Sequence, residues 1–151
     1  MIDGATYVHT NLIARDVARR VRFYSQTFGC ELVPPERNYE GAALDAGTGL
    51  EGARLRGMHL RLPGGGADGP TLEIFQYGEP APTLWPEVNR PGFCHIAFSV
   101  GSVEDARAEV LANGGEVVGE IVDLETFDGR TVTWCYVRDP EANIIELQAW
   151  S

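Results

Sequence analysis

Hydrophobic and polar residues alternate in four short stretches of the chain, and each stretch carries one histidine or glutamate. The stretches are Tyr7–Leu12, Thr71–Phe75, Gly92–Phe98 and Asn143–Leu147. Alternation with a period of two is typical of β-strands that bury one face. These four residues are His9, Glu73, His95 and Glu146. Because an ionisable group is costly to bury without a partner, these four positions are candidates for a shared polar site.

Two other stretches repeat apolar residues at helical spacing. The first runs from about Asp16 to Phe28 and places on one side Val17, Val21, Tyr24 and Phe28. The second runs from about Ser102 to Asn113 and places on its inward side Val103, Ala106, Val110 and Leu111. Asp16 and Ser102 are suitable N-caps, and Gly29 and Gly114-Gly115 stand where a glycine commonly ends a helix. Both stretches therefore predict helices with defined ends.

The two halves of the chain repeat one order of elements. Gly29 follows His9, and Gly115 follows His95, at the same spacing of 20 residues. The pattern predicts a duplicated β-α-β-β-β unit with eight strands in all. The spacing from His to Glu differs, and segments 34–50 and 64–70 absorb the surplus of the first half. We predict one domain over 1–151, with module one at about 1–80 and module two at about 92–151, joined by a proline-rich linker.

Strand alternation also predicts where the four ionisable side chains point. Successive side chains of a strand face opposite sides, and the immediate neighbours of these residues are mostly apolar. Leu72 and Ile74 flank Glu73, for example, and Ile145 and Leu147 flank Glu146. The apolar neighbours suit packing against the helices. All four ionisable groups can therefore point to one concave side of the sheet.

Two imidazoles and two carboxylates on one face can be satisfied together by a single divalent metal ion. The set suits Zn²⁺, Ni²⁺, Co²⁺, Mn²⁺ or Fe²⁺ without selecting among them. Taken singly, each residue is more commonly a surface or hydrogen-bonded polar group. The matched placement in both halves favours metal binding. The remaining histidine, His59, is a candidate to line the cleft, but we expect for it a structural role without metal binding.

The chain resembles the vicinal oxygen chelate superfamily, which includes glyoxalase I, methylmalonyl-CoA epimerase, extradiol dioxygenases and fosfomycin-resistance proteins. The most specific segments are Gly92–Val100 and Asp139–Leu147, where this chain has Ala142 in place of the family's glycine. The resemblance implies an α+β fold in which two β-α-β-β-β modules form a curved mixed sheet around a metal cleft. It also implies the ligands His9, Glu73, His95 and Glu146.

The resemblance further implies an activity. In family lyases and isomerases a metal ion polarises a substrate with vicinal oxygens, and a nearby glutamate moves a proton. Glu146 and Glu73 are therefore the catalytic candidates. The combined His/Glu/His/Glu set resembles bacterial glyoxalase I, whereas dioxygenases and fosfomycin-resistance proteins typically leave the position of Glu73 without a ligand. We predict a metal-dependent lyase or isomerase that acts on a small molecule through an enediolate-type intermediate.

Two alternative functions stay open at this point. Bleomycin-resistance relatives bind a drug in the cleft, usually lack the ligands and catalyse no reaction. An aromatic cleft for such a ligand can be drawn from Tyr7, Phe75, Tyr77, Trp85, Phe93 and Trp134. The other alternative is a metal-dependent dioxygenase or biosynthetic enzyme on the same fold. The metal-ligand set discriminates between an enzyme and a drug-binding protein, because relatives that only bind a drug usually lack these ligands.

The composition limits the classes of molecule that we expect the protein to bind. A net charge of −10 argues against nucleic acid or an anionic membrane as a partner. The sequence shows no signal-peptide pattern and no run of about 20 apolar residues, so we expect a cytoplasmic protein with a small-molecule substrate. All 12 basic residues are arginine, which excludes a lysine nucleophile. We expect a homodimer because relatives commonly form one, with modules paired within one chain or exchanged between two.

Overall fold

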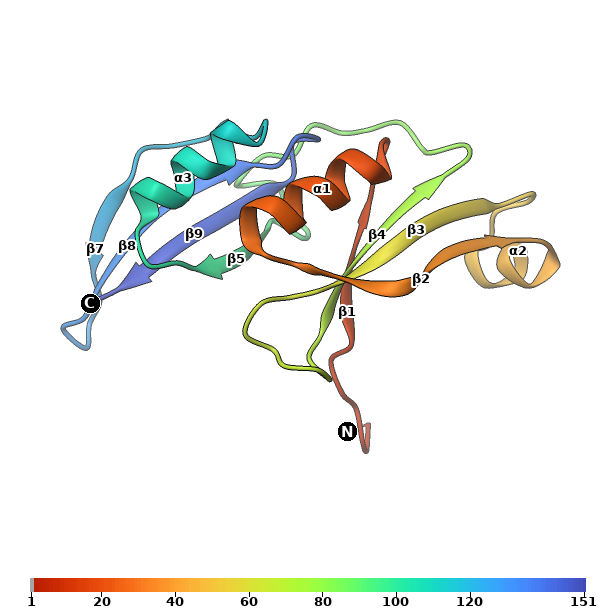
Figure 1. Ribbon diagram of the computed structural model, residues 1–151, viewed down its shortest axis with the longest axis horizontal. Coiled ribbons are helices and arrows are strands. Elements are labelled where there is room, and N and C mark those ends of the chain that lie inside the picture. The colour runs from red at the N-terminus through yellow and green to blue at the C-terminus, as the bar shows by residue number, and fades with distance from the viewer. Residues whose placement is uncertain (1) are drawn as a thin grey trace. The chain divides into compact units, whose positions relative to one another are not determined.

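The computed structural model describes residues 2–151 and divides them into two compact units (Figure 1). The first unit ends at Pro82, and the second is Thr83–Ser151. Each unit combines a mixed β-sheet with a helix that follows its first strand. The predicted α+β class with mixed sheets is therefore confirmed. That the two units form one domain stays a prediction.

The sheet of the first unit has four strands in the order β1-β4-β3-β2. Their bounds are β1 His9–Ile13, β2 Glu31–Glu40, β3 Arg54–Arg61 and β4 Thr71–Tyr77. β1 runs parallel to β4, and the other two pairs are antiparallel. Helix α1 (Val17–Phe28) joins β1 to β2, and the short helix α2 (Ala42–Thr48) joins β2 to β3. The sequence did not indicate α2, which has no buried residue and lies between Gly41 and Gly49.

The sheet of the second unit has five strands. Their bounds are β5 His95–Ser99, β6 Glu116–Val117, β7 Val122–Glu125, β8 Thr131–Arg138 and β9 Ile144–Trp150. β5 runs parallel to β9, whereas β6, β7 and β9 pair antiparallel with β8. Both β6 and β7 lie along β8, so the interruption between Val117 and Val122 splits one expected strand into two. This split accounts for nine strands where the repeat predicted eight.

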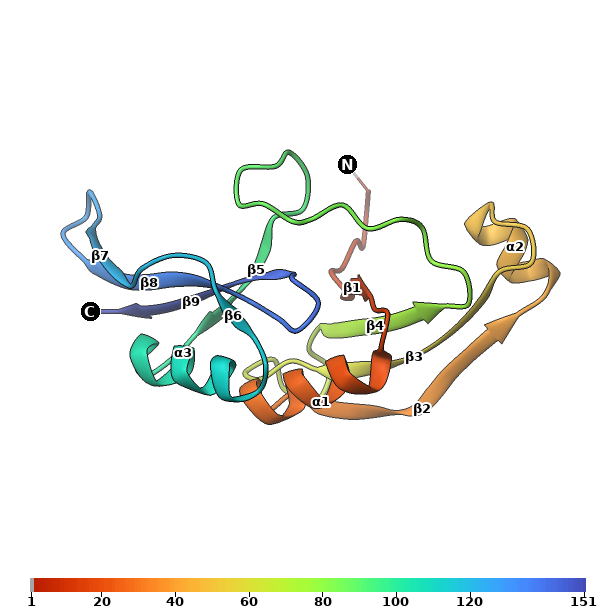
Figure 2. The ribbon, with the colours of Figure 1, turned by 90° about the horizontal axis from the view of Figure 1, so that it is seen from above.

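Helix α1 begins and ends where the sequence predicted. The Asp16 side chain accepts a hydrogen bond from the Arg19 amide at 3.0 Å, and Gly29 ends the helix in the left-handed conformation with φ 67°. The helix packs on β3 and β4, on one side of the sheet (Figure 2). Its contact side is formed by Val17, Phe23 and Tyr24, together with the buried Arg20, which the apolar pattern did not identify.

Helix α3 (Val103–Ala112) occupies the same place in the second unit and packs on β8 and β9. Ser102 caps it by accepting a hydrogen bond from the Asp105 amide at 3.1 Å. Val103 and Val110 are buried as predicted, but Leu111 is 43% exposed, so its inward assignment was wrong. One residue turns a helix by about 100°, so Leu111 follows the buried Val110 but does not share its face.

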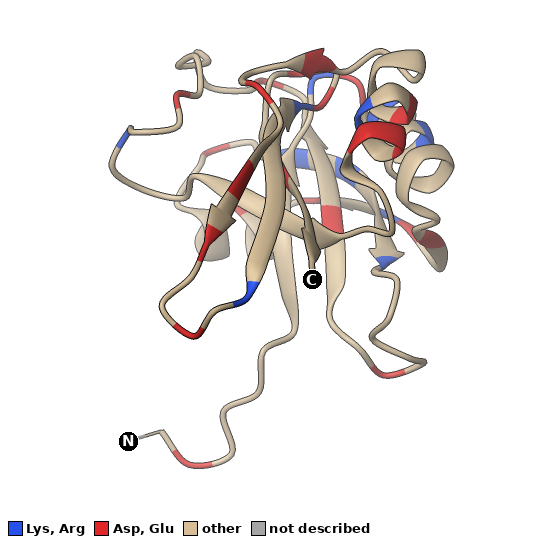
Figure 3. Cartoon of the chain, turned by 90° about the vertical axis from the view of Figure 1, so that its left-hand side faces the viewer, with Lys and Arg blue, Asp and Glu red and all other residues tan. Residues whose placement is uncertain are grey.

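Helices α1 and α3 each cover the apolar face of their own sheet. Leu60, Leu72 and Ile74 are fully buried in the first unit, as are Val137, Ile145 and Leu147 in the second. A fully buried aliphatic side chain stabilises a fold by about 1.5–3 kcal/mol, so these faces determine strand register. Within residues 2–151, no helix is long and apolar enough to cross a membrane. Acidic residues lie on helices, strands and connecting loops (Figure 3).

Candidate metal centre

Three neighbouring strands of the first unit bring His9, His59 and Glu73 together. In the parallel β1–β4 pair, His9 lies opposite Thr71 and Asn11 lies opposite Glu73. In the antiparallel β3–β4 pair, His59 lies directly opposite Glu73. Leu72 and Ile74 turn toward α1, so alternation turns Glu73 to the other face. Burial of the apolar residues on one face of the sheet therefore places these polar side chains together on the other face.

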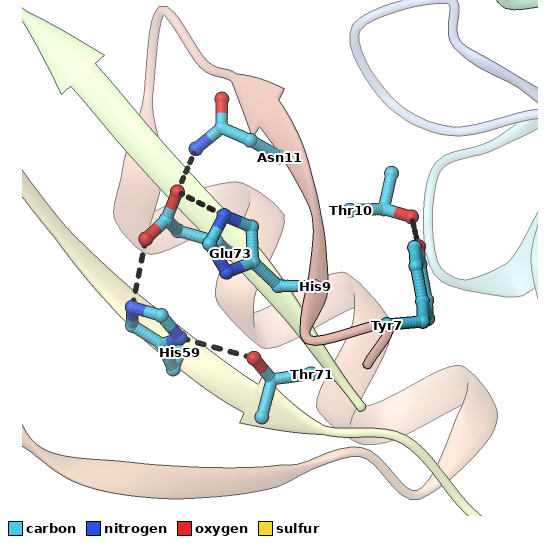
Figure 4. A network of polar contacts seen from close by, with 7 residues as sticks. All are labelled: Tyr7, His9, Thr10, Asn11, His59, Thr71 and Glu73. Atoms are coloured by element: carbon cyan, nitrogen blue, oxygen red, sulfur yellow. Dashed lines mark hydrogen bonds and ion pairs between the residues drawn. The ribbon is translucent and has the colours of Figure 1, made fainter. Parts of the chain in front are cut away.

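The Glu73 carboxylate has polar contacts on both of its oxygens (Figure 4). Oε1 lies 2.8 Å from Nε2 of His59. Oε2 accepts a hydrogen bond from Nδ2 of Asn11 at 2.6 Å and lies 3.6 Å from Nε2 of His9. Glu73 is only 8% exposed, so these contacts replace most of its hydration.

His59 is part of this polar group, a position on the cleft side that the sequence left open while favouring a structural role without metal binding. Burial lowers its pKa, with further lowering from Arg37 and His9, and the Glu73 charge opposes that shift. A carboxylate only accepts hydrogen bonds, so the neutral His59 ring donates one to Glu73 from Nε2. Its Nδ1 atom is then the acceptor for the hydroxyl group of Thr71, at 3.0 Å. The β3–β4 register that pairs His59 with Glu73 depends on the 62–70 loop, and the sequence gives no means of fixing it.

The second unit repeats this arrangement with one histidine and one glutamate. In the β5–β9 pair, His95 lies opposite Ile144 and Ala97 lies opposite Glu146. Nε2 of His95 is 3.3 Å from Oε2 of Glu146. Tyr136 of β8 lies directly opposite Glu146 and packs its ring 5.1 Å from the His95 ring. Burial raises the pKa of Tyr136, and so do the charge of Glu146 and the hydrogen bond between the two side chains.

The structure thus brings together His9 with Glu73 and His95 with Glu146, one pair in each unit. In both units the histidine lies opposite the residue two positions before the glutamate. Equal register is what an internal duplication predicts. Among residues 2–151, no group of three or more His, Cys, Asp and Glu side chains is arranged to hold a metal ion. The four-ligand set therefore stays a prediction.

The spacing within each pair fits ligands of one ion. Ligands with bonds of about 2.0–2.2 Å, set 90–110° apart, have donor atoms about 2.8–3.6 Å from each other. The separations between histidine Nε2 and carboxylate Oε2 are 3.6 Å and 3.3 Å. Both exceed the usual 2.7–3.2 Å of an N–H···O hydrogen bond. The two nitrogens and two carboxylates also suit the first-row divalent ions.

Comparison with known families identifies the class of protein. Residues 6–147 match the family model of the glyoxalase/bleomycin resistance protein/dioxygenase superfamily. The chain therefore belongs to this superfamily, as its resemblance to vicinal oxygen chelate proteins implied. None of the curated proteins compared with the sequence matches it.

Solved structures support the fold. A glyoxalase family protein from Bacillus cereus has a TM-score of 0.81 and 20% identity, and the match covers 99% of each chain. The genomically encoded fosfomycin resistance protein FosX from Listeria monocytogenes has a TM-score of 0.62 and 18% identity, covering 100% of this chain and 96% of the other. A second FosX structure, complexed with Mn(II) and sulfate, has a TM-score of 0.54 and 17% identity, covering 99% of this chain and 93% of the other.

Proposed function

We propose that this protein is a metal-dependent lyase or isomerase that acts on a small substrate with vicinal oxygens. The observation that supports it best is the Nε2–Oε2 spacing in both units, 3.6 Å for His9 with Glu73 and 3.3 Å for His95 with Glu146. Such repetition is expected if both pairs serve one ion. FosX, a member of the same fold group, was crystallised with Mn(II), which supports a divalent ion here.

In this proposal the metal ligands are His9, Glu73, His95 and Glu146. A bound divalent ion supplies Lewis-acid polarisation of a substrate carbonyl, which makes the neighbouring C–H more acidic. His9 and His95 would hold the ion through their imidazole nitrogens. A glutamate carboxylate, from Glu146 or Glu73, accepts the α-proton and returns it to the adjacent carbon, so the reaction passes through an enediolate and leaves the enzyme unchanged.

Both candidate glutamates are largely shielded from solvent, which suits this proton transfer better than full exposure would. The Glu73 side chain is 11% exposed and that of Glu146 is 19% exposed. Partial burial excludes competing water and strengthens electrostatic interactions.

The face of the second unit also carries aromatic rings, with the Trp134 ring packed 5.0 Å from the Tyr136 ring. These rings favour a second candidate function, the sequestration of an aromatic ligand without chemistry.

The deciding experiment combines isotope exchange with oxygen measurement. Metal-free protein is reconstituted separately with Zn²⁺, Ni²⁺, Co²⁺, Mn²⁺ and Fe²⁺ and incubated in D₂O with candidate substrates. The panel contains the methylglyoxal–glutathione hemithioacetal, methylmalonyl-CoA, vicinal diketones and α-hydroxyketones. Mass spectrometry should find deuterium at the α-carbon without consumption of O₂. Stoichiometric O₂ uptake would instead identify a dioxygenase, and tight binding with no turnover in any metal form would identify a sequestering protein.

We also propose that the protein forms a homodimer, since members of this superfamily commonly do so. Light scattering coupled to size-exclusion chromatography gives the mass directly. A mass near twice 16.5 kDa is expected. A mass of one chain at all concentrations contradicts this proposal without affecting the proposed reaction.

A further inference from the structure

The two glutamates of the site are held by different sets of neighbours. We propose that Asn11 and His59 are positioning residues that fix the Glu73 carboxylate for metal binding, a pair of supports that Glu146 has only in part. This inference rests on the proposed function, because it concerns how a proposed ligand is oriented. It assigns to Asn11 and His59 a role that neither the family match nor the proposed ligand set gives them.

Glu73 is held from two sides. His59 meets Oε1 at 2.8 Å from β3, and Asn11 donates to Oε2 at 2.6 Å from β1. The two strands flank β4, so the donors approach the carboxylate from opposite directions (Figure 4). Rotation of the carboxylate would break both contacts at once. The orientation of Glu73 is therefore set before any ion binds.

His59 is itself oriented by its neighbours. Thr71, two residues before Glu73 on β4, meets Nδ1 of the ring at 3.0 Å. The ring of Phe75, two residues after Glu73, lies 6.0 Å from the His59 ring in an edge arrangement. Thr71 and Phe75, on either side of Glu73 along β4, therefore orient the His59 ring that contacts Glu73. A donor with a fixed ring plane restricts the carboxylate more than a freely rotating one.

Anchoring on both sides leaves Glu73 able to bind a metal. Each carboxylate oxygen offers two lone-pair directions, and each donor uses one of them. Oε2 lies 3.6 Å from Nε2 of His9, so its remaining lone pair and the imidazole are at ligand spacing. Hydrogen bonds of this kind to metal-binding carboxylates orient the ligand for the ion.

Glu146 lacks one of these two supports. By register, Ala97 stands opposite Glu146 where Asn11 stands opposite Glu73. A methyl group donates no hydrogen bond, so the β5 side supplies Glu146 with none from this position. On the other side, Tyr136 takes the place of His59 and reaches Glu146 through its hydroxyl group. Glu73 therefore has a donor at both directly opposite register positions, whereas Glu146 has one at Tyr136 and none at Ala97.

The test measures metal affinity directly, without an activity assay. Isothermal titration with Co²⁺ is carried out on metal-free wild type, Asn11→Ala and His59→Leu, and the visible Co²⁺ spectrum is recorded for each. Loss of a partner that orients a metal ligand typically costs 10–100-fold in affinity. We expect a loss in that range for each variant, and a changed Co²⁺ spectrum for His59→Leu.

Two further variants separate positioning from general stability. His59→Gln keeps an N–H donor near the position of Nε2 and should recover much of the affinity that His59→Leu loses. Asn38→Ala removes the same type of side chain from an exposed position on β2, on the face of the sheet opposite to Glu73. This variant should bind Co²⁺ like the wild type. Thermal unfolding of each metal-free variant identifies those that fail to fold, and affinities are compared only among folded variants.

The outcomes distinguish the two levels of the proposal. If wild type binds no divalent ion, the proposed function fails and this inference fails with it. If wild type binds Co²⁺ tightly and both Asn11→Ala and His59→Leu bind equally well, only the positioning role is overturned. Equal losses in His59→Gln and His59→Leu would also contradict it, because donation to Glu73 would then not be the cause.

Discussion

Gly57 lies directly opposite Phe75 in the β3–β4 pair, and the space over its backbone is occupied by the Phe75 ring. A Cβ atom at Gly57 would lie 2.3 Å from Cδ1 of Phe75 and 2.1 Å from the backbone oxygen of Ile74. Phe75 is two residues from Glu73, and its ring also packs against the His59 ring, so the space at Gly57 affects the neighbourhood of Glu73.

Replacing Gly57 with alanine should therefore destabilise the fold by about 1–3 kcal/mol, the usual cost of overpacking. The clash includes backbone, so rotation of a side chain cannot relieve it. Chemical denaturation measures the change in the free energy of unfolding. Gly101→Ala is the matched control, since a Cβ there meets no atom within 4 Å. Equal stability of the two variants would mean that β3 and β4 separate without cost.

Replacing Ala142 with glycine should stabilise the protein. Ala142 has φ 73° in the turn between β8 and β9, in the left-handed region that L-residues adopt at a cost of roughly 1–2 kcal/mol. Glycine removes this strain but loses more entropy on folding, so we expect a net gain of at most about 1 kcal/mol. The midpoint of thermal unfolding should rise by a few degrees, and an unchanged or lower midpoint would contradict the strain argument.

The three cysteines should differ in reactivity. Burial raises the pKa of the Cys30 thiol to about 11 and also raises the pKa of Cys135. Since the thiolate is the reactive form, both should resist iodoacetamide at pH 8 in the native state. Cys94 is half-buried and should react first. Peptide mass spectrometry of native and unfolded protein identifies the modified residue, and early labelling of Cys30 would show that its burial is wrong.

Cys30 also predicts a pH dependence of stability. A thiol with a raised pKa in the folded state favours the neutral form, so its contribution is present below its ordinary pKa of 9.0 and decreases as pH rises toward about 11. The free energy of unfolding of wild type should therefore fall over this range more than that of Cys30→Ala. Parallel slopes for the two proteins would indicate that Cys30 ionises without penalty.

The two proposed catalytic glutamates should respond differently to loss of charge. Glu146→Gln removes a carboxylate that we propose carries the proton, so kcat at saturating metal should fall by about 10²–10⁴-fold. Glu73→Gln weakens a proposed ligand and should lower metal affinity while retaining more turnover once metal is supplied in excess. Steady-state kinetics over a metal titration measures both effects. The reverse order would assign proton transfer to Glu73.

Metal removal should lower stability by mass action. An ion that binds only the folded state at 100 times its Kd raises the free energy of unfolding by about 2.7 kcal/mol. Denaturation of chelator-treated protein, with and without added Co²⁺ or Zn²⁺, measures the difference. A His9→Ala/His95→Ala double variant should lose most of it. The same stability for wild type with and without metal would argue against binding to the folded protein.

Much of the fold follows from local signals in the sequence. Asp16 and Ser102 cap their helices through the side-chain contacts expected of such residues, and Gly29 takes the left-handed conformation that ends α1. The alternating apolar residues turn toward the helices as predicted, as Leu72 and Ile74 show. These features depend on neighbours within a few residues, so they can be identified from the sequence before the fold is known.

What the sequence did not reveal depends on register or on weak local preference. Pairing of His59 with Glu73 requires the exact offset of β3 against β4, which the 62–70 loop sets. Burial of Arg20 in the contact side of α1 involves a hydrogen bond to the Ile13 carbonyl at 3.1 Å, a contact between separate elements. Helix α2 has seven residues and buries none of them, so it leaves no apolar period to detect.

The repeated register has a consequence for how such a protein can evolve. Each position of the polar face exists twice, at Asn11 and Ala97 or at His59 and Tyr136, so a mutation can alter one copy while the other keeps its chemistry. A single-copy site has no such spare. Divergence between the copies therefore lets one half of the polar face change while the other half keeps its residues.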